Sequence, residues 1–233
     1  MHSFLYGTCI TVLYIIAMVG VMMLVRKLFP IPDELFRKIL HFILLGAYIP
    51  LVFAFEAWWM AAIFAASLII ILFPALSIAS KIPMLSAFII ERKKGEFLSS
   101  MVLAVGMMAF SVIVCWGLFA DRYLVLAVIY AWGIGDGLAA LVGKRFGKHK
   151  IKWKLADGKK SVEGSAAMFL CSLVAVFTVL MVRGGIGMPM CCAIALLAAL
   201  VCTVTELCAK DGWDTVLCPV SAMIVIIPLV MLF

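Results

Sequence analysis

Residues 133–165 read GIGDGLAALVGKRFGKHKIKWKLADGKKSVEGS, and this stretch decides how the chain is organised. Its first ten residues are apolar except for Asp136, and they complete an apolar segment at 123–142. After a run rich in lysine and arginine, a second apolar segment starts at Ser165. Because about 20 apolar helical residues cross a hydrocarbon core of about 30 Å, the stretch predicts two membrane spans joined by a basic loop at 143–164.

The composition of the whole chain points the same way. It has 233 residues, of which 67% are hydrophobic and 13% charged, and its mean hydropathy is +1.25, which is too apolar for a soluble domain. We expect an all-α polytopic membrane protein with seven to eight transmembrane helices, forming a single integral domain over residues 1–233. The candidate spans are 4–25, 38–55, 57–74, 97–119, 123–142, 165–182, 186–204 and 215–233. The first span has no basic start and no small-residue cleavage site, so we expect a retained helix.

The basic residues predict the orientation, because short cytoplasmic loops are enriched in Lys and Arg. With eight spans, 17 of the 19 basic residues fall on one side, and only Arg122 and Arg183 fall on the other. Of the acidic residues, only Glu56 and Asp121 lie away from the basic side. We therefore expect both termini to face away from the cytoplasm, with charge of both signs gathered at the cytoplasmic surface. The eight cysteines form no CxxC pair, lie mostly within spans, and are interpreted as packing residues.

Asp136 is the charged residue that least fits a membrane span. A charge at a helix centre costs roughly 2.5 to 3.5 kcal/mol on insertion scales, so such a residue usually faces protein or water and serves a function. It lies eight residues before Lys144, which is about 12 Å along a helix, so it should be reachable from the cytosol.

Small residues surround this aspartate on both sides. Gly133, Gly135 and Gly137 allow a backbone or a ligand to come close, and the stripe of Ala139, Gly143 and Gly147 suits tight helix contact. Whether the stripe only packs helices or also admits a ligand stays open at this point.

The basic loop has two interpretations. Clusters of four to eight basic residues beside a span attract anionic lipid headgroups, so the loop can act as a topogenic or lipid-surface patch. Its ordered end, 157–165, instead places a glycine turn, two lysines and a hydroxyl at a helix start, which suits phosphate. The candidate phosphate-binding residues here are Lys144, Arg145, Gly158, Lys159, Lys160 and Ser161.

Neither common nucleotide-binding motif fits this region. Five residues separate Gly137 from Gly143 where a Walker A loop has four, and Lys144 is followed by Arg145 in place of Ser or Thr. The glycines around Asp136 follow no predicted strand, which excludes a Rossmann turn. A nucleotide site here is of another type.

Two further groups of polar residues lie at predicted helix ends. Arg37, Lys38 and His41 stand at the start of the second span, where they either anchor the helix or address a phosphate from one face. Glu206 and Asp214, with Asp211 between them, carry oxygen ligands of the kind that Mg²⁺ takes together with substrate phosphates. Asp214 also fits as the amino-terminal cap of the last span.

These motifs together resemble the polyprenol kinase family of membrane enzymes, which comprises dolichol kinases, phytol kinases and CTP-dependent diacylglycerol kinases. The resemblance covers most of the chain. It rests on Gly135-Asp136-Gly137-Leu138-Ala139 with Gly143 and Gly147, on Lys160-Ser161-Val162-Glu163-Gly164-Ser165, on Arg37-Lys38-Ile39-Leu40-His41-Phe42, and on Glu206 with Gly212-Trp213-Asp214. Thr215 stands where phytol-kinase-like members often have Asn. The short chain looks most like the prokaryotic and plastid branch.

The resemblance implies transfer of the terminal phosphoryl group of a nucleoside triphosphate to a polyprenol, phytol-like alcohol or diacylglycerol at the cytoplasmic face of a cell membrane. CTP is the expected donor, with ATP or UTP possible, and Mg²⁺ the expected metal. We assign catalysis to Asp136, Lys160 and Glu163, metal binding to Asp136, Glu206 and Asp214, and phosphate binding to the basic-loop residues together with Arg37, Lys38 and His41. The expected partners are these substrates and membrane lipid, without nucleic acid; the oligomeric state is left undecided.

Three alternatives stay open from the sequence. A phosphatidate cytidylyltransferase needs the same membrane surface, metal and triphosphate cradle. A transporter would use Asp136 as an ion or proton site, although neither inverted repeats nor midplane charge is evident. A membrane scaffold would need only the lipid-binding loop.

Overall fold

Helices account for nearly all of the regular structure in the part of the chain that the computed structural model describes, residues 2–79, 95–152, 160–210 and 212–233. Within those ranges, seven helical segments are long and apolar enough to cross a membrane: His2–Leu28, Asp33–Phe53, Phe97–Leu118, Arg122–Phe146, Val162–Arg183, Met188–Cys208 and Asp214–Met231. The predicted span at 57–74 falls in a further apolar helix, α4 (Trp58–Ala79). The prediction of an all-α polytopic membrane protein is confirmed.

The chain divides into two compact units, Met1–Gly117 and Leu118–Phe233. That all 233 residues act as one integral domain stays a prediction.

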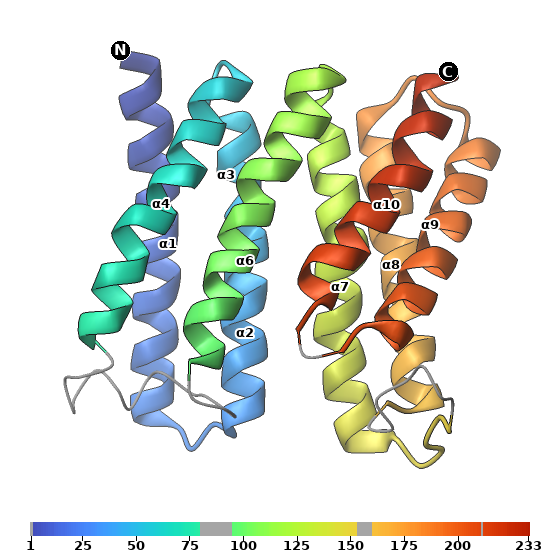
Figure 1. The fold of residues 1–233 in the computed structure, drawn as a ribbon, viewed down its shortest axis with the longest axis horizontal. Coiled ribbons are helices and arrows are strands. Elements are labelled where there is room, and N and C mark those ends of the chain that lie inside the picture. Colours follow the sequence, from blue (N-terminus) through green and yellow to red (C-terminus); the bar gives the residue numbers. More distant parts are fainter. Residues whose placement is uncertain (1, 80–94, 153–159, 211) are drawn as a thin grey trace. The chain divides into compact units, whose positions relative to one another are not determined.

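Unit 1 contains the amino-terminal helices (Figure 1). They are α1 (His2–Leu28), α2 (Asp33–Gly46), α3 (Tyr48–Phe53), α4 (Trp58–Ala79) and α6 (Glu96–Ser111), followed by the π-helix η1 (Val112–Leu118). The second predicted span is broken between α2 and α3 because Pro50 has no N–H to donate to the carbonyl four residues earlier, at Gly46. The broken helix still reaches membrane length, since α3 continues directly from α2.

Two contacts fix α1 in unit 1. At its carboxyl end, Arg26 pairs with Asp33 at 3.0 Å and lies 4.2 Å from the centre of the Phe36 ring. At its amino end, Phe4 contacts Phe55 edge to face, with ring centres 5.9 Å apart. Charge therefore holds one end of α1, and aromatic packing holds the other.

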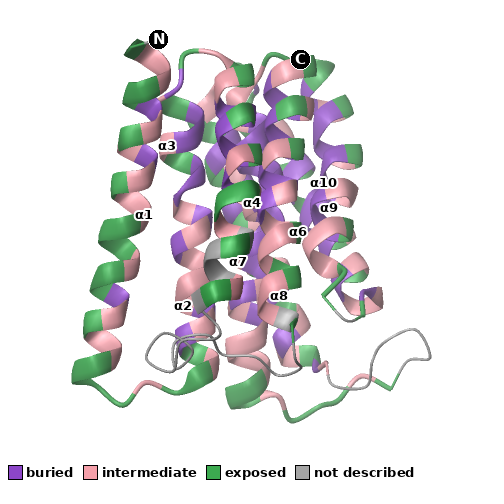
Figure 2. Ribbon diagram, turned by 60° about the vertical axis from the view of Figure 1, so that its left-hand side comes forward, coloured by how far each residue is buried: buried purple, intermediate pink, exposed green. Residues whose placement is uncertain are grey.

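Unit 2 is a four-helix arrangement in which consecutive helices run in opposite directions (Figure 1). Its helices are α7 (Arg122–Phe146), α8 (Val162–Arg183), α9 (Met188–Cys208) and α10 (Asp214–Met231). Each pair of consecutive helices is in contact, and α10 packs on α7 to complete the ring. Buried residues run along much of α7, from Leu124 to Ala139 (Figure 2).

The small-residue stripe forms the contact between α7 and α8. A Cβ atom on Gly164 of α8 would lie 3.0 Å from the carbonyl oxygen of Ala139 and 3.4 Å from the Cα of Gly143. Nearer the middle of α7, a Cβ on Gly135 would collide with the side chains of Met168 and Ser172. Glycine suits both positions, because the α7 backbone lies close to Gly164 and side chains of α8 fill the space beside Gly135.

Candidate functional site

The candidate site lies at one end of unit 2, where α7 and α9 finish and α8 and α10 begin. Alternating helix directions bring together residues that lie far apart in the sequence. The carboxyl ends of α7 and α9 present carbonyl oxygens, and the amino ends of α8 and α10 present N–H groups. We call this end the polar end; it contains Asp136, Lys160, Glu163, Glu206 and Asp214.

Ser161 starts α8 by capping it. Its backbone is extended, and its Oγ accepts a hydrogen bond from the N–H of Gly164 at 3.2 Å. The side chain is buried at 3% exposure, because it lies against Gly143 and Gly147 of the stripe. Its hydroxyl is therefore engaged in starting the helix. Phosphate binding by Ser161 stays a prediction.

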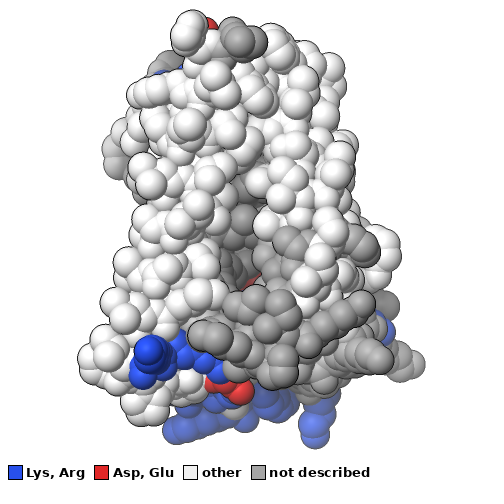
Figure 3. All heavy atoms as spheres, turned by 90° about the vertical axis from the view of Figure 1, so that its left-hand side faces the viewer, with Lys and Arg blue, Asp and Glu red and all other residues white. Residues whose placement is uncertain are grey.

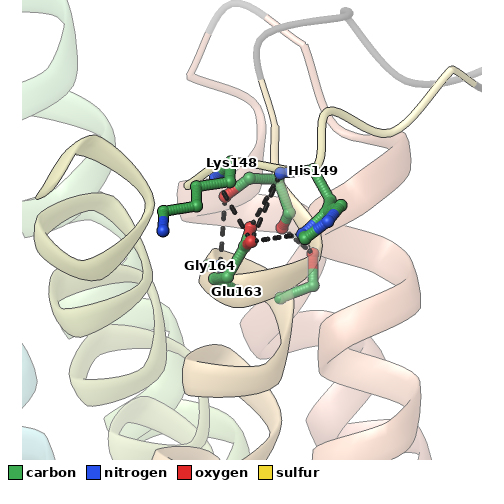
Figure 4. Close-up of polar contacts among 6 residues, drawn as sticks. Lys148, His149, Glu163 and Gly164 are labelled. Atoms are coloured by element: carbon green, nitrogen blue, oxygen red, sulfur yellow. Dashed lines mark hydrogen bonds and ion pairs between the residues drawn. The ribbon is translucent and has the colours of Figure 1, made fainter. Parts of the chain in front are cut away.

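Glu163 ties the beginning of the basic loop to the first turn of α8 (Figure 4). Its carboxylate accepts hydrogen bonds from the backbone N–H groups of Lys148 and His149, each at 3.2 Å. The Nδ1 atom of His149 lies 2.8 Å from the same carboxylate. Because three groups of one short segment converge on it, Glu163 acts here as an organiser of the loop.

Backbone hydrogen bonds close the base of the same loop. The N–H of Val162 donates to the carbonyl of His149, and that of Ile151 donates to the carbonyl of Lys160, both at 3.0 Å. An isolated antiparallel bridge joins Lys150 to Ser161. The beginning and end of the predicted loop at 143–164 are thus held side by side.

Lys160 connects the start of α8 to the end of α9. Its Nζ lies 2.8 Å from Oε1 of Glu206, and it also donates to the backbone carbonyls of Glu206 and Ala209. The side chains are only 18% and 11% exposed. A lysine at the carboxyl end of a helix is favourable because the last carbonyls there carry partial negative charge.

Three carboxylates of the polar end come from three helices that pack on one another: Asp136 from α7, Glu206 from α9 and Asp214 from α10. Within the described residues, no three histidine, cysteine or acidic side chains are placed to hold a metal ion together. Mg²⁺ nevertheless needs only one or two carboxylates when substrate phosphates and water supply its other oxygen ligands, so this donor set fits it.

The other predicted residues fall in different places. Lys144 and Arg145 are exposed in the last turn of α7, next to the polar end. Gly158 and Lys159 lie outside the described residues, as does Asp211. The polar end therefore contains two of the predicted cations in exposed positions and a third, Lys160, in an ion pair.

The early basic motif belongs to α2 of unit 1. Arg37 donates to Glu34 at 3.3 Å, Lys38 is buried at 8% exposure, and the His41 ring lies edge to face with Phe42. These residues are described within unit 1 only, so their predicted role toward a phosphate stays a prediction.

Sequence reasoning missed the two contacts that organise the polar end. The ion pair between Lys160 and Glu206 spans 46 residues, and no local pattern signals it. The contact between Glu163 and His149 spans 14 residues and depends on the path of the loop. The N-cap at Ser161 was detectable, because a serine directly before an apolar run is a helix-start signal.

Comparison of the chain with protein-family models, curated proteins and solved structures finds no match. The fold defines a class: the protein is an all-α, multi-pass membrane protein.

Proposed function

We propose that this protein is a lipid alcohol kinase that transfers the terminal phosphoryl group of a nucleoside triphosphate, with CTP the first candidate, to an isoprenoid alcohol or diacylglycerol. The observation that carries the proposal is the ion pair between Lys160 and Glu206 at the polar end, with Asp136 and Asp214 in the two helices, α7 and α10, that contact α9. Each of these residues comes from a different segment of unit 2. Charged groups so close to a membrane core are retained mainly for function.

The residues of the polar end are of the types that phosphoryl transfer requires. The protein has little covalent chemistry to perform, so it must position the donor and acceptor and neutralise the charge of the phosphates. Exposed Lys144 and Arg145, beside the polar end, are suited to attract the triphosphate. Mg²⁺, when bound by the carboxylates, would supply further charge neutralisation on the phosphate oxygens.

Asp136 is the residue that we place nearest the reaction. It is partly exposed in α7, and its two neighbours Gly135 and Gly137 are buried. A carboxylate in this position can accept the proton of an acceptor hydroxyl or orient that hydroxyl for attack. Lys160 would act by holding the Glu206 carboxylate in place, since its ammonium group already donates to that side chain.

The membrane supplies the second substrate. A lipid alcohol can keep its chain among the apolar helices while its hydroxyl reaches the polar end at the interface. The strong excess of basic residues predicted on this side favours the cytoplasmic face of the membrane.

The test is a product analysis with the purified protein in lipid nanodiscs. Labelled CTP or ATP is incubated with Mg²⁺ and, in turn, phytol, a polyprenol and diacylglycerol. A kinase yields CDP or ADP and the labelled phosphate ester of the lipid alcohol, and the Asp136→Asn variant yields neither. Pyrophosphate release with phosphatidate would identify a cytidylyltransferase instead. Solute flux in proteoliposomes without nucleotide turnover would identify a transporter.

A further inference from the structure

Three lysines follow the end of α7 in the described part of the basic loop. Lys148, Lys150 and Lys152 occupy every second position there, and all three are exposed. We call these three residues the lysine edge. The proposed reaction uses Lys144 and Arg145, within α7, to attract the triphosphate, and it assigns nothing to the lysine edge. This positively charged surface is therefore available for another ligand.

The contacts of Glu163 hold this segment by its backbone and by His149. The Glu163 carboxylate accepts from the backbone N–H groups of Lys148 and His149, each at 3.2 Å. In the close-up view, the side chain of Lys148 extends away from that carboxylate (Figure 4). The ammonium group of Lys148 is thus presented at the surface while its backbone is fixed.

Backbone contacts also set the level of the lysine edge relative to α8. An antiparallel bridge pairs Lys150 with Ser161, the cap of α8, and the N–H of Val162 donates to the carbonyl of His149 at 3.0 Å. The 22 residues of α8 make a helix about 33 Å long, close to the thickness of a hydrocarbon core, about 30 Å. Because such a helix begins at the boundary between hydrocarbon and headgroups, the lysine edge lies beside the headgroups.

Exposed apolar side chains before and after the loop mark the same boundary. Phe146, in the last turn of α7, is 57% exposed, and Val162, in the first turn of α8, is 54% exposed. The guanidinium carbon of Arg145 lies 5.5 Å from the centre of the Phe146 ring. Exposed apolar groups next to cations suit a membrane interface, where the apolar part contacts acyl chains and the cation contacts phosphates. This surrounding favours a lipid phosphate over a phosphate in solution.

Unit 1, described by itself, also has basic residues where a membrane-spanning helix ends. Arg26 and Lys27 occupy the last turn of α1, a 27-residue apolar helix with few buried side chains. On the face that Figure 3 shows, lysine and arginine gather mainly near one end, and most of the other described surface is uncharged. Cations at the end of an apolar, lipid-exposed helix lie at the level of anionic headgroups.

We propose that the lysine edge binds the headgroups of anionic phospholipids in the membrane leaflet at the polar end of unit 2. The charge of the edge, its level beside the start of α8 and the exposed apolar residues next to it together identify this ligand. Each lysine near an anionic membrane surface contributes about a fivefold preference for it, and the attraction falls off within a Debye length. The edge concentrates anionic lipid around unit 2, and this needs neither nucleotide nor kinase activity.

The test is photo-crosslinking in nanodiscs of mixed phosphatidylcholine and phosphatidylglycerol. Two probes carry the same diazirine near the headgroup, one on each lipid, and mass spectrometry after chymotrypsin digestion measures labelling of the segment that follows α7. We expect the phosphatidylglycerol probe to label this segment at least about fivefold more than the phosphatidylcholine probe. The triple variant Lys148→Gln, Lys150→Gln and Lys152→Gln should reduce that ratio below about twofold. The matched triple variant with arginine at the same positions should keep the ratio, because it keeps the charge.

Salt and nucleotide provide two further measurements that need no substitution. Raising the salt from about 0.1 M to about 1 M shortens the Debye length from about 10 Å to about 3 Å, so the labelling ratio should fall toward one. Saturating CTP with Mg²⁺ should leave the ratio unchanged, whereas displacement would make the ligand a nucleotide and overturn the proposal. A ratio near one in the unmodified protein, a ratio that survives in the glutamine variant, or a ratio that does not respond to salt would also overturn it. None of these measurements involves phosphoryl transfer, so their outcome is independent of the kinase proposal.

Discussion

The two ends of unit 2 use the same kind of ion pair in different settings. At one end, Arg183 pairs with Asp121 at 2.5 Å; at the polar end, Lys160 pairs with Glu206 at 2.8 Å. The side chains are similarly protected, at 20% and 11% exposure in the first pair and 18% and 11% in the second. Burial of an ion pair therefore does not distinguish a structural end from a functional one.

The difference lies in what surrounds each pair. Asp121 also caps α7 by accepting from the N–H of Tyr123 at 2.8 Å, and Arg183 also donates to the carbonyl of Gly184. These contacts join helix ends and explain the charges as structure. At the polar end, Asp136 of α7 and Asp214 of α10 add two further carboxylates to the ion pair. Charged side chains that several helices bring to one end of a membrane-spanning unit are the mark of a candidate site.

The largest expected effect is a loss of lipid phosphorylation that occurs for a variant at the polar end of unit 2 and not for a variant at the opposite end. Asp136→Asn removes a charge that we place at the reaction, so lipid phosphorylation should fall by about 10³-fold or more. Asp121→Asn should leave turnover within about threefold while lowering the free energy of unfolding by about 3 kcal/mol, because Asn still caps the helix but leaves Arg183 without its charged partner. Labelled-phosphate transfer and unfolding in mixed micelles measure the two quantities. Equal activity loss in both variants would remove the distinction.

The next effect concerns the ion pairs themselves. Lys160→Met should lower the free energy of unfolding by about 3 kcal/mol, because it leaves the Glu206 carboxylate buried without its partner. Arg183→Met should lower the free energy of unfolding by a similar amount, because it leaves the Asp121 carboxylate without its charged partner. Double-mutant cycles with Glu206→Gln and Asp121→Asn measure each coupling energy. We expect similar couplings, with loss of turnover only for the Lys160 pair; activity that survives in K160M would contradict this.

A smaller effect should follow from crowding the contact between α7 and α8. Gly164→Ala places a methyl group about 3.0 Å from the Ala139 carbonyl, and the overpacking should cost about 2 kcal/mol of unfolding free energy. Gly106→Ala in α6 is the matched control, because a Cβ there meets nothing within 4 Å. That variant should be stabilised by up to about 1 kcal/mol, from helix propensity alone. Thermal unfolding measures the stability of both variants. An equal change in stability for G164A and G106A would contradict tight packing between α7 and α8.

The smallest expected effect is the loss of one helix cap at the polar end. Ser161→Ala removes the acceptor for the Gly164 N–H and should cost about 1 kcal/mol of unfolding free energy. Ser165→Ala should cost less, because the Ser161 carbonyl that accepts its hydroxyl also accepts its backbone N–H. If phosphate binding also depends on Ser161, the S161A variant will show a raised KM for the nucleotide beyond its stability loss. An unchanged KM would restrict Ser161 to capping.

Hydrophobic patterning was enough to predict the helices. Each predicted span overlaps a helix of the structure, because crossing a bilayer requires a long apolar helix wherever it occurs. The main difference from the predicted helices is the interruption between α2 and α3 within the predicted span at 38–55. It follows from the missing N–H of Pro50. The small residues of the stripe were identified from their spacing, but the structure was needed to show which helix they contact.

The sequence by itself determined the class of protein and the sites of unusual charge, because the cost of burying a polar residue in the membrane applies to each segment separately. Only the tertiary structure decided which charges meet. Lys160 contacts Glu206, Glu163 contacts His149, and Arg183 contacts Asp121, across 14 to 62 residues of chain. Such pairings depend on helix packing and on the paths of loops, because electrostatic attraction acts through distance in space and not through position in the sequence.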